Sequence, residues 1–321
     1  RWIMELIKTP PDVLEDAVRY ADVVFVTMPI TFIWLSYTTF LRGIGDSRSP
    51  LIVLVASAIV GVVLTPALIL GPFGLGIIAA PIANIISTTI GLAGLLVYLE
   101  RRGNPLALSK LWHFMGIDVQ ILLTLVRIGI PTGIQFVMIS LSEIAVISMV
   151  NRFGSSATAA YGAVNQVVSY VQFPAISIGI TSSIFGAQSI GAQRTDRLRK
   201  IVRTGVTMNY VIGGVLILIV YLLSHEILSL FITDPPTLQT ATGLLYITLW
   251  SYVIFGNNSV LSGMMRSSGS VLVPTLISIC SIWFVEVPTA YVLSQGALGL
   301  SGVWIAYPIT FIVSLTGQAI Y

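Results

Sequence analysis

Two carboxylates within long apolar runs are the side chains of this chain best suited to chemistry. Glu286 lies in the run Ile282-Trp-Phe-Val-Glu-Val-Pro288, and Glu143 lies late in another run, 121–150. A charged side chain at the centre of a bilayer costs roughly 2.5–3.5 kcal/mol on insertion scales, so such acids are rare and mark ion pathways. We expect both to exchange a proton or release a cation. The alternatives are a structural interaction across helices for Glu286 and an outer-face position for Glu143.

Polar and aromatic side chains within the same runs form a second candidate group. Hydrogen bonding between helices is the usual role of an intramembrane amide, and packing is the usual role of a single aromatic ring. Together, however, these side chains predict a polar internal surface on which aromatic rings could hold organic cations by cation–π contact. The candidate cavity residues are Gln135, Gln166, Asn165, Asn257, Asn258, Trp283, Tyr161 and Met138.

Residues for common enzymatic sites are scarce. The chain has one cysteine, Cys280, and two histidines, which leaves little material for a zinc site or a Ser/His/Asp triad. A net charge of +3 over 321 residues is too small to suggest nucleic-acid binding. There is no phosphate-binding loop, so ATP hydrolysis is unsupported. We therefore expect no enzymatic activity, no metal, no cofactor other than H⁺ or Na⁺ as a coupling ion, and no nucleic-acid partner.

Composition places these side chains in membrane helices. The chain is 55% hydrophobic and 9% charged, with a mean hydropathy of +0.94, whereas soluble proteins carry about 25% charged residues. Apolar runs of about 20 residues can cross a bilayer as helices. We predict an all-α polytopic membrane protein with nine spans, at 20–41, 50–71, 75–99, 121–150, 157–190, 204–231, 240–263, 272–294 and 298–320.

The basic residues predict the orientation of these spans. Short cytoplasmic loops carry an excess of Lys and Arg. The connections after the first, third, fifth and seventh spans, together with the adjoining span ends, hold twelve of the 16 basic residues and are therefore predicted to be cytoplasmic. These residues are Arg42, Arg48, Arg101, Arg102, Lys110, Arg127, Arg194, Arg197, Arg199, Lys200, Arg203 and Arg266.

Two pairs of segments indicate an internal repeat. Arg, Gly and Pro of the segment 42–50 recur in 266–274 at an offset of 224 residues, and 75–83 matches 298–306 at an offset of 223. Six spans separate the first pair, so both copies point the same way through the membrane. Parallel repeats are typical of secondary transporters, in which two halves move around a substrate site. The alternative is that Gly and Pro recur only because of turn chemistry.

Several of these segments resemble the multidrug and toxic compound extrusion (MATE) family. The loop Leu41-Arg-Gly-Ile-Gly-Asp-Ser-Arg-Ser-Pro50 is similar to the one after the family's fourth helix. Further similar segments are Gly129-Ile-Pro131, Asn151-Arg-Phe-Gly154, Phe185-Gly-Ala-Gln188-Ser-Ile-Gly191-Ala, and the run from Pro288 through Gly302-Val-Trp304 to Pro308. The resemblance implies a two-lobe bundle with parallel six-helix repeats. It also implies cation-coupled export of amphipathic, often cationic, organic compounds through a cavity between the lobes.

The family's coupling residues match this sequence in part. Some members carry a glutamate in the seventh helix, where Glu143 lies about one turn later than expected, and an aspartate in the tenth. The matching tenth helix here contains no acid, only Asn257 and Asn258. Another branch uses an aspartate in the first helix with polar partners in the sixth. Asn84 and Thr88 lie on the helix of this chain that corresponds to the sixth. We name Glu286, Glu143, Asn84 and Thr88 as candidate coupling residues.

The resemblance and the repeat together predict the organisation of the chain. Residues 1–110 are expected to be the last three helices of an incomplete N-terminal lobe, and 111–321 the six helices of a C-terminal lobe. The start at Arg1 and the single span before the first repeated loop suggest that about three helices precede this chain.

We expect a monomeric multi-pass protein of the inner (plasma) membrane that exports small organic molecules across the bilayer by antiport with H⁺ or Na⁺. One alternative is a lipid-linked oligosaccharide flippase of the same superfamily, which is disfavoured because few Lys or Arg residues lie within the spans. The other is a membrane subunit without transport activity.

Overall fold

The computed structural model describes residues 11–70, 76–111, 116 and 118–321. In this part of the chain, nine helical segments are long and apolar enough to cross a membrane, which confirms the nine predicted spans. They are Val18–Gly43, Arg48–Leu70, Ala79–Arg101, Val119–Asn151, Ser155–Gly191, Thr195–Leu222, Pro235–Ser267, Leu272–Gln295 and Gly299–Ile320. The described residues form helices and connecting turns without strands, so the all-α prediction is also confirmed.

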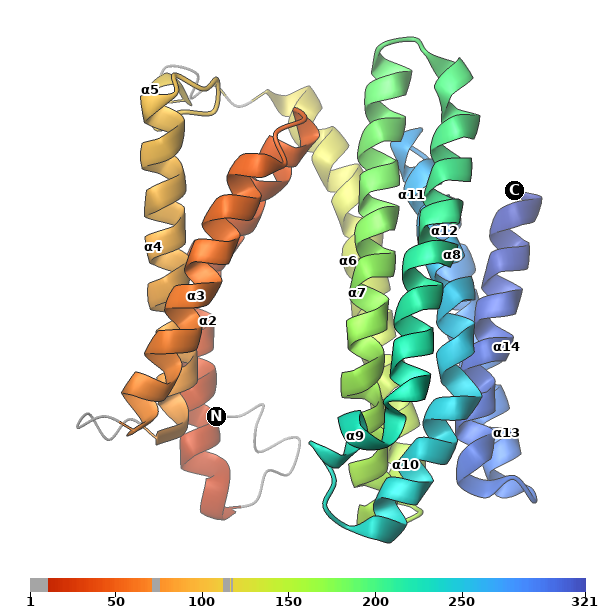
Figure 1. Ribbon diagram of the computed structural model, residues 1–321. Coiled ribbons are helices and arrows are strands. Elements are labelled where there is room, and N and C mark those ends of the chain that lie inside the picture. Colours follow the sequence, from red (N-terminus) through yellow and green to blue (C-terminus); the bar gives the residue numbers. More distant parts are fainter. Residues whose placement is uncertain (1–10, 71–75, 112–115, 117) are drawn as a thin grey trace. The chain divides into compact units, whose positions relative to one another are not determined.

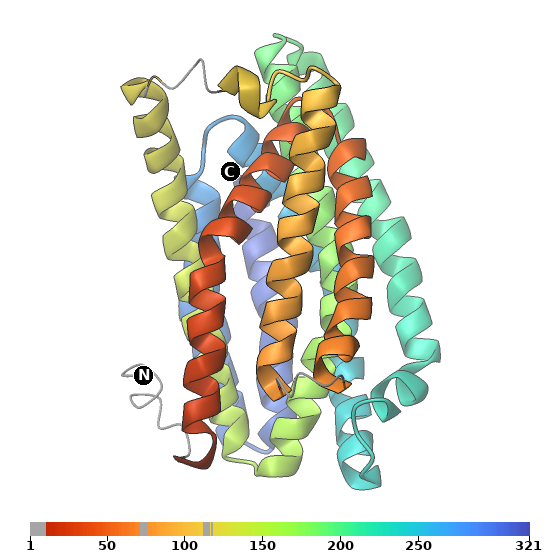
Figure 2. The same cartoon turned by 90° about the vertical axis from the view of Figure 1, so that its left-hand side faces the viewer.

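The chain divides into two compact units, 1–117 and 118–321. The first contains the long helices α2 (Pro11–Gly43), α3 (Arg48–Leu70) and α4 (Ala79–Arg101), with the short η1 (Gly76–Ile78) and α5 (Leu108–Leu111). α4 lies between α2 and α3 and packs against both (Figure 2). A small core of Leu41, Leu95 and Leu99 holds the C-terminal ends of α2 and α4 together. The proposal that residues 1–110 are an incomplete lobe stays a prediction.

The second unit is a larger bundle (Figure 1). Its helices are α6 (Val119–Asn151), α7 (Ser155–Gly191), α8 (Leu198–Leu222), α9 (Ser224–Ser229), α10 (Pro235–Thr248), α11 (Tyr252–Ser267), α12 (Leu272–Cys280), α13 (Val287–Gln295) and α14 (Gly299–Ile320). The short η3 (Thr195–Arg197) precedes α8, η4 (Leu249–Ser251) joins α10 to α11, and the π-helical η5 (Ser281–Glu286) joins α12 to α13.

α7 is the central helix of this bundle, because it packs against α6, α8, α10 and α11. Glycines bring the backbones of α7 and α11 into direct contact. A Cβ atom on Gly263 would lie 2.3 Å from the carbonyl oxygen of Gly179, and a Cβ on Gly179 would lie 2.7 Å from that of Ser259. Small residues at such crossings are what allow membrane helices to approach closely without a hydrophobic driving force.

The predicted sixth span, 204–231, differs from the structure at both ends. α8 begins at Leu198, a turn and a half before the predicted start, and ends at Leu222. The basic residues of its first turns can extend their charged ends to water, so they do not end the helix. Ser224 begins the separate short helix α9, which carries the exposed His225 and Glu226.

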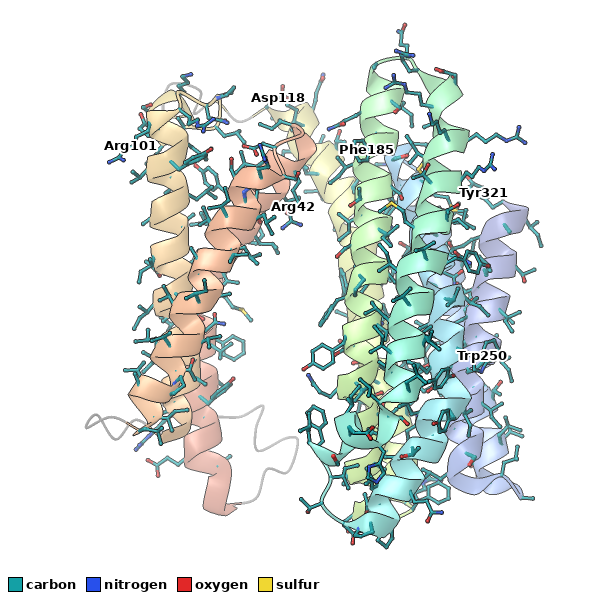
Figure 3. The ribbon with its side chains drawn as sticks, viewed as in Figure 1. Arg42, Arg101, Asp118, Phe185, Trp250 and Tyr321 are labelled. Atoms are coloured by element: carbon teal, nitrogen blue, oxygen red, sulfur yellow. The ribbon has the colours of Figure 1, made fainter. Side chains whose placement is uncertain are left out.

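The repeated segments have the same backbone geometry. Gly45 and Gly269 both have a positive φ, 92° and 84°. In each copy the glycine N–H donates to the residue three before it, Arg42 or Arg266, and the next N–H donates to the residue before that arginine. This is a helix ending with a residue in the left-handed (αL) conformation, which glycine adopts without the steric clash that a Cβ atom would cause. Arg42 lies at the end of α2 in Figure 3.

The offsets found in the sequence recur in the helix boundaries. α2 and α11 end, and α3 and α12 begin, 224 residues apart, and Pro50 and Pro274 are each the third residue of their helix. Gly76 and Gly299, in the second pair of segments, also share a positive φ, 53° and 48°. Leu75 itself lies outside the described residues. Turn chemistry alone would not place two separate pairs of segments at nearly the same offset, so the internal repeat is the better explanation.

Candidate functional site

Glu286 is the last residue of the π-helical segment η5, in the middle of a membrane span. The following Pro288 gives a local reason for this geometry, because a proline has no N–H to donate to the carbonyl four residues earlier and its ring clashes with that carbonyl. Single π-helical turns are rare and occur often at functional sites. The result is a carboxylate only 7% exposed inside the second unit.

Tyrosines from two other helices lie near this carboxylate, and a third tyrosine lies beside one of them. Glu286 interacts electrostatically with Tyr252 of α11 and Tyr307 of α14. The hydroxyl oxygens of Tyr307 and Tyr161 of α7 lie 3.4 Å apart, and the ring of Tyr161 packs edge-on against that of Trp304, with centroids 5.3 Å apart. Sequence reasoning named Tyr161 but missed Tyr252, Tyr307 and Trp304, because their positions in apolar helices look the same as ordinary packing positions.

Glu143 of α6 is the second carboxylate of this region. It is exposed on the surface of the second unit, and it interacts electrostatically with both Glu286 and Tyr252. The structure therefore brings together the two acids that were singled out from different parts of the sequence. We call Glu286, Glu143, Tyr161, Tyr252 and Tyr307 the acidic–aromatic cluster.

No positive charge compensates Glu286 within the described residues. The ion pairs of this part of the chain are Arg19–Glu15 and Arg194–Asp196, both far from it in sequence, and no described group donates a hydrogen bond to its carboxylate. The alternative of a structural ion pair is thus not found there. Burying an unpaired carboxylate is costly, so the cluster favours binding a proton or a cation.

Three predicted cavity residues make contacts between helices. The amide oxygen of Gln135 accepts from Arg266 Nη2 at 2.6 Å and from Thr275 Oγ1 at 3.4 Å, which links α6, α11 and α12. The indole N–H of Trp283 donates to the carbonyl of Met138 at 3.2 Å, which links η5 to α6. These contacts hold the π-helical segment and its neighbours against α6.

The asparagines of α11 are buried in a second polar network. Asn257 accepts a hydrogen bond from Asn209 of α8 at 3.0 Å and donates to Tyr210 at 3.2 Å. Asn258 donates to the carbonyl of Phe311 at 3.1 Å, and its own amide oxygen has no partner. Asn209, only 1% exposed, was missed by the sequence reasoning. Its signal was an amide in an apolar helix four residues after Gly205.

Two further predicted residues, Asn165 and Gln166, lie on an exposed face of α7, apart from these networks. Gln166 donates to the hydroxyl of Tyr170 at 3.3 Å.

Asn84 and Thr88 belong to the first unit. The hydroxyl of Thr88 donates to the amide oxygen of Asn84 at 3.4 Å. Both line a cavity of about 640 Å³ between α2, α3 and α4, together with the polar side chains of Ser57, Thr65 and Ser87. The residues that line this hollow include no carboxylate.

Comparison with known proteins identifies the family. The MatE family model matches residues 1–67 and 131–292, which is more than half of the chain. The chain belongs to the MATE family. MATE proteins are multi-pass transporters of the plasma membrane and not enzymes, so the predicted family, class and location are confirmed.

Individual relatives support this assignment. The "Probable multidrug resistance protein YoeA" of Bacillus subtilis (strain 168) is 51% identical over 318 residues, which span 98% of this chain and 69% of that protein. The "Probable multidrug resistance protein YpnP" of the same organism is 26% identical over 322 residues, 99% of this chain and 70% of that protein.

A solved structure shares the fold. An outward-facing multidrug resistance MATE transporter superposes with a TM-score of 0.90 at 18% identity, over 98% of this chain and 70% of that one. At this identity the likeness concerns the MATE fold alone. The acidic–aromatic cluster is therefore argued from the residues of this chain.

Proposed function

We propose that this MATE protein is a secondary active transporter that exports amphipathic or cationic organic compounds in exchange for H⁺ or Na⁺, acting as a monomer in the bilayer. The observation that carries the proposal is Glu286, a carboxylate buried at a π-helical turn without an ionic partner among the described residues. Such a group holds a proton or a metal cation more favourably than it holds a bare charge.

The proposed coupling follows from competition for one negative charge. A proton or Na⁺ bound at Glu286 neutralises the carboxylate and removes the attraction for an organic cation. Once that ion has left, the charge returns and the aromatic rings of the acidic–aromatic cluster supply cation–π contacts to the compound. Glu143 adds a second negative charge nearby. Because only one of the two cations can occupy the site at a time, export of the organic compound would be coupled obligatorily to import of the ion.

The two other functions considered are less well supported. A lipid-linked oligosaccharide flippase would need a cationic cavity for a pyrophosphate, whereas the buried charged side chain of the second unit is an acid. A subunit without transport activity is disfavoured by membership of a transporter family. Relatives named as multidrug resistance proteins favour small organic compounds as the cargo.

The test is gradient-driven efflux by the intact transporter carrying Glu286→Gln, which removes the charge and keeps the shape. We expect insertion to be unchanged and gradient-driven uptake of ethidium into everted vesicles, in which the cytoplasmic face is outside, to be abolished. Glu226→Gln, at an exposed acid in the short helix α9, is the matched control and should export normally. Normal efflux by Glu286→Gln would remove Glu286 from the coupling mechanism.

A further inference from the structure

The basic residues between α7 and α8 form a charge cluster separate from the acidic–aromatic cluster. Residues 194–203 contain five basic side chains and one acid, Asp196. Asp196 lies 3.9 Å from Arg194. In the part of the chain that the structure describes, the remaining four have no carboxylate partner. They are Arg197, Arg199, Lys200 and Arg203, all exposed.

Two of these arginines line one hollow. Arg199 and Arg203 are four residues apart in α8 and thus share a face of the helix. With Val202, Val206 and Thr207 they line a hollow of about 610 Å³. Two guanidinium groups on one face repel each other unless an anion lies between them. Side chains that end in nitrogen atoms (blue) project from this end of α8 in Figure 3.

This hollow lies on the flank of α8, beside the face that is buried in the second unit, because Val206 and the buried Gly213 are seven residues apart. The buried residues of α8 are Gly205, Asn209, Gly213, Ile217 and Val220, and they pack towards α7 and α11. Along this flank the two arginines are followed by the half-buried Val206 and then by the exposed Tyr210. This change from guanidinium to apolar side chains along the helix axis matches the boundary between lipid headgroups and acyl chains.

We propose that Arg199 and Arg203 form a binding site for an anionic phospholipid of the cytoplasmic leaflet. The two guanidinium groups bind the headgroup phosphate, for which their paired N–H donors are well suited. The acyl chain lies along Val206 and the exposed Tyr210. The basic-residue count predicts that this end of α8 is cytoplasmic, where clusters of Lys and Arg beside a span attract anionic lipid. The site goes beyond the proposed transport function and does not depend on it.

The test measures lipid bound to the intact purified transporter in detergent by native mass spectrometry. Phosphatidylglycerol is compared with the zwitterionic phosphatidylcholine, and Arg199→Gln/Arg203→Gln is compared with Arg197→Gln/Lys200→Gln. The control pair removes the same charge from the same segment but does not line the hollow. All four side chains are exposed, so thermal unfolding should show that both variants fold as the parent does.

We expect phosphatidylglycerol to bind the parent and the control variant at least tenfold more tightly than phosphatidylcholine does. In Arg199→Gln/Arg203→Gln the two lipids should bind equally. Equal losses in both double variants would indicate diffuse charge and overturn the proposed site. Displacement of phosphatidylglycerol by an equal concentration of inorganic phosphate would overturn the assignment of a lipid as the ligand.

Discussion

At the scale of single residues, Glu286 and Glu143 could be selected from the sequence because a charge in an apolar run is conspicuous and costly. Their spatial association could not be predicted, because the two residues lie 143 positions apart in the sequence. The tyrosines of the acidic–aromatic cluster were harder to find. Tyr252 and Tyr307 have the spacing of packing residues, and only the folded bundle brings them near Glu286.

Trp283 gives a prediction at this scale. Its indole N–H joins η5 to the Met138 carbonyl of α6. Trp283→Phe keeps most of the ring and loses the hydrogen bond, so we expect a loss of stability of about 0.6–1 kcal/mol, the usual value within membranes.

Unfolding of the detergent-solubilised protein by increasing sodium dodecyl sulfate measures this loss. Trp250→Phe is the control, since its partly exposed side chain makes no described hydrogen bond. An equal effect of the two substitutions would show that lost ring volume, and not the hydrogen bond, is responsible.

At the scale of helices, the apolar runs predicted the nine spans, and the repeated Arg, Gly and Pro predicted two matching turns. The sequence did not predict the π-helical segment, because a single proline is equally compatible with a kink. It also did not predict that α8 extends into the basic segment. The position at which α8 begins depends on how far its long basic side chains extend towards water. The hydrophobic periodicity of the sequence does not show this.

The crossing of α7 and α11 gives a prediction at this scale. Gly263→Ala would place a Cβ atom 2.3 Å from the Gly179 carbonyl oxygen, so one backbone must move. Overpacking of this kind costs about 1–3 kcal/mol. We expect Gly263→Ala to lower the thermal unfolding temperature clearly. Gly162→Ala, where the added Cβ meets open space, should leave it unchanged or raise it slightly. Equal unfolding temperatures for the two variants would contradict the close contact of the backbones.

At the scale of the whole molecule, the parallel repeat and the charge distribution make a joint prediction about topology. Cysteines introduced as Arg101→Cys and Arg197→Cys should react with an impermeant maleimide only from the cytoplasm, and Ser155→Cys only from outside. The intrinsic Cys280 is exposed in the second unit and must first be changed to serine. Reaction of positions 101 and 197 from opposite sides would contradict both the span count and the parallel orientation of the repeats.

In the proposed mechanism one carboxylate exchanges an inorganic cation for an organic one. The release of ions when ethidium binds to the intact purified transporter measures this exchange. The release of H⁺ is followed with a pH dye in weak buffer, and the release of Na⁺ with a selective electrode. We expect ethidium to release one of these ions from the parent and from Glu226→Gln, and none from Glu286→Gln. Release from Glu286→Gln equal to that from the parent would contradict the account.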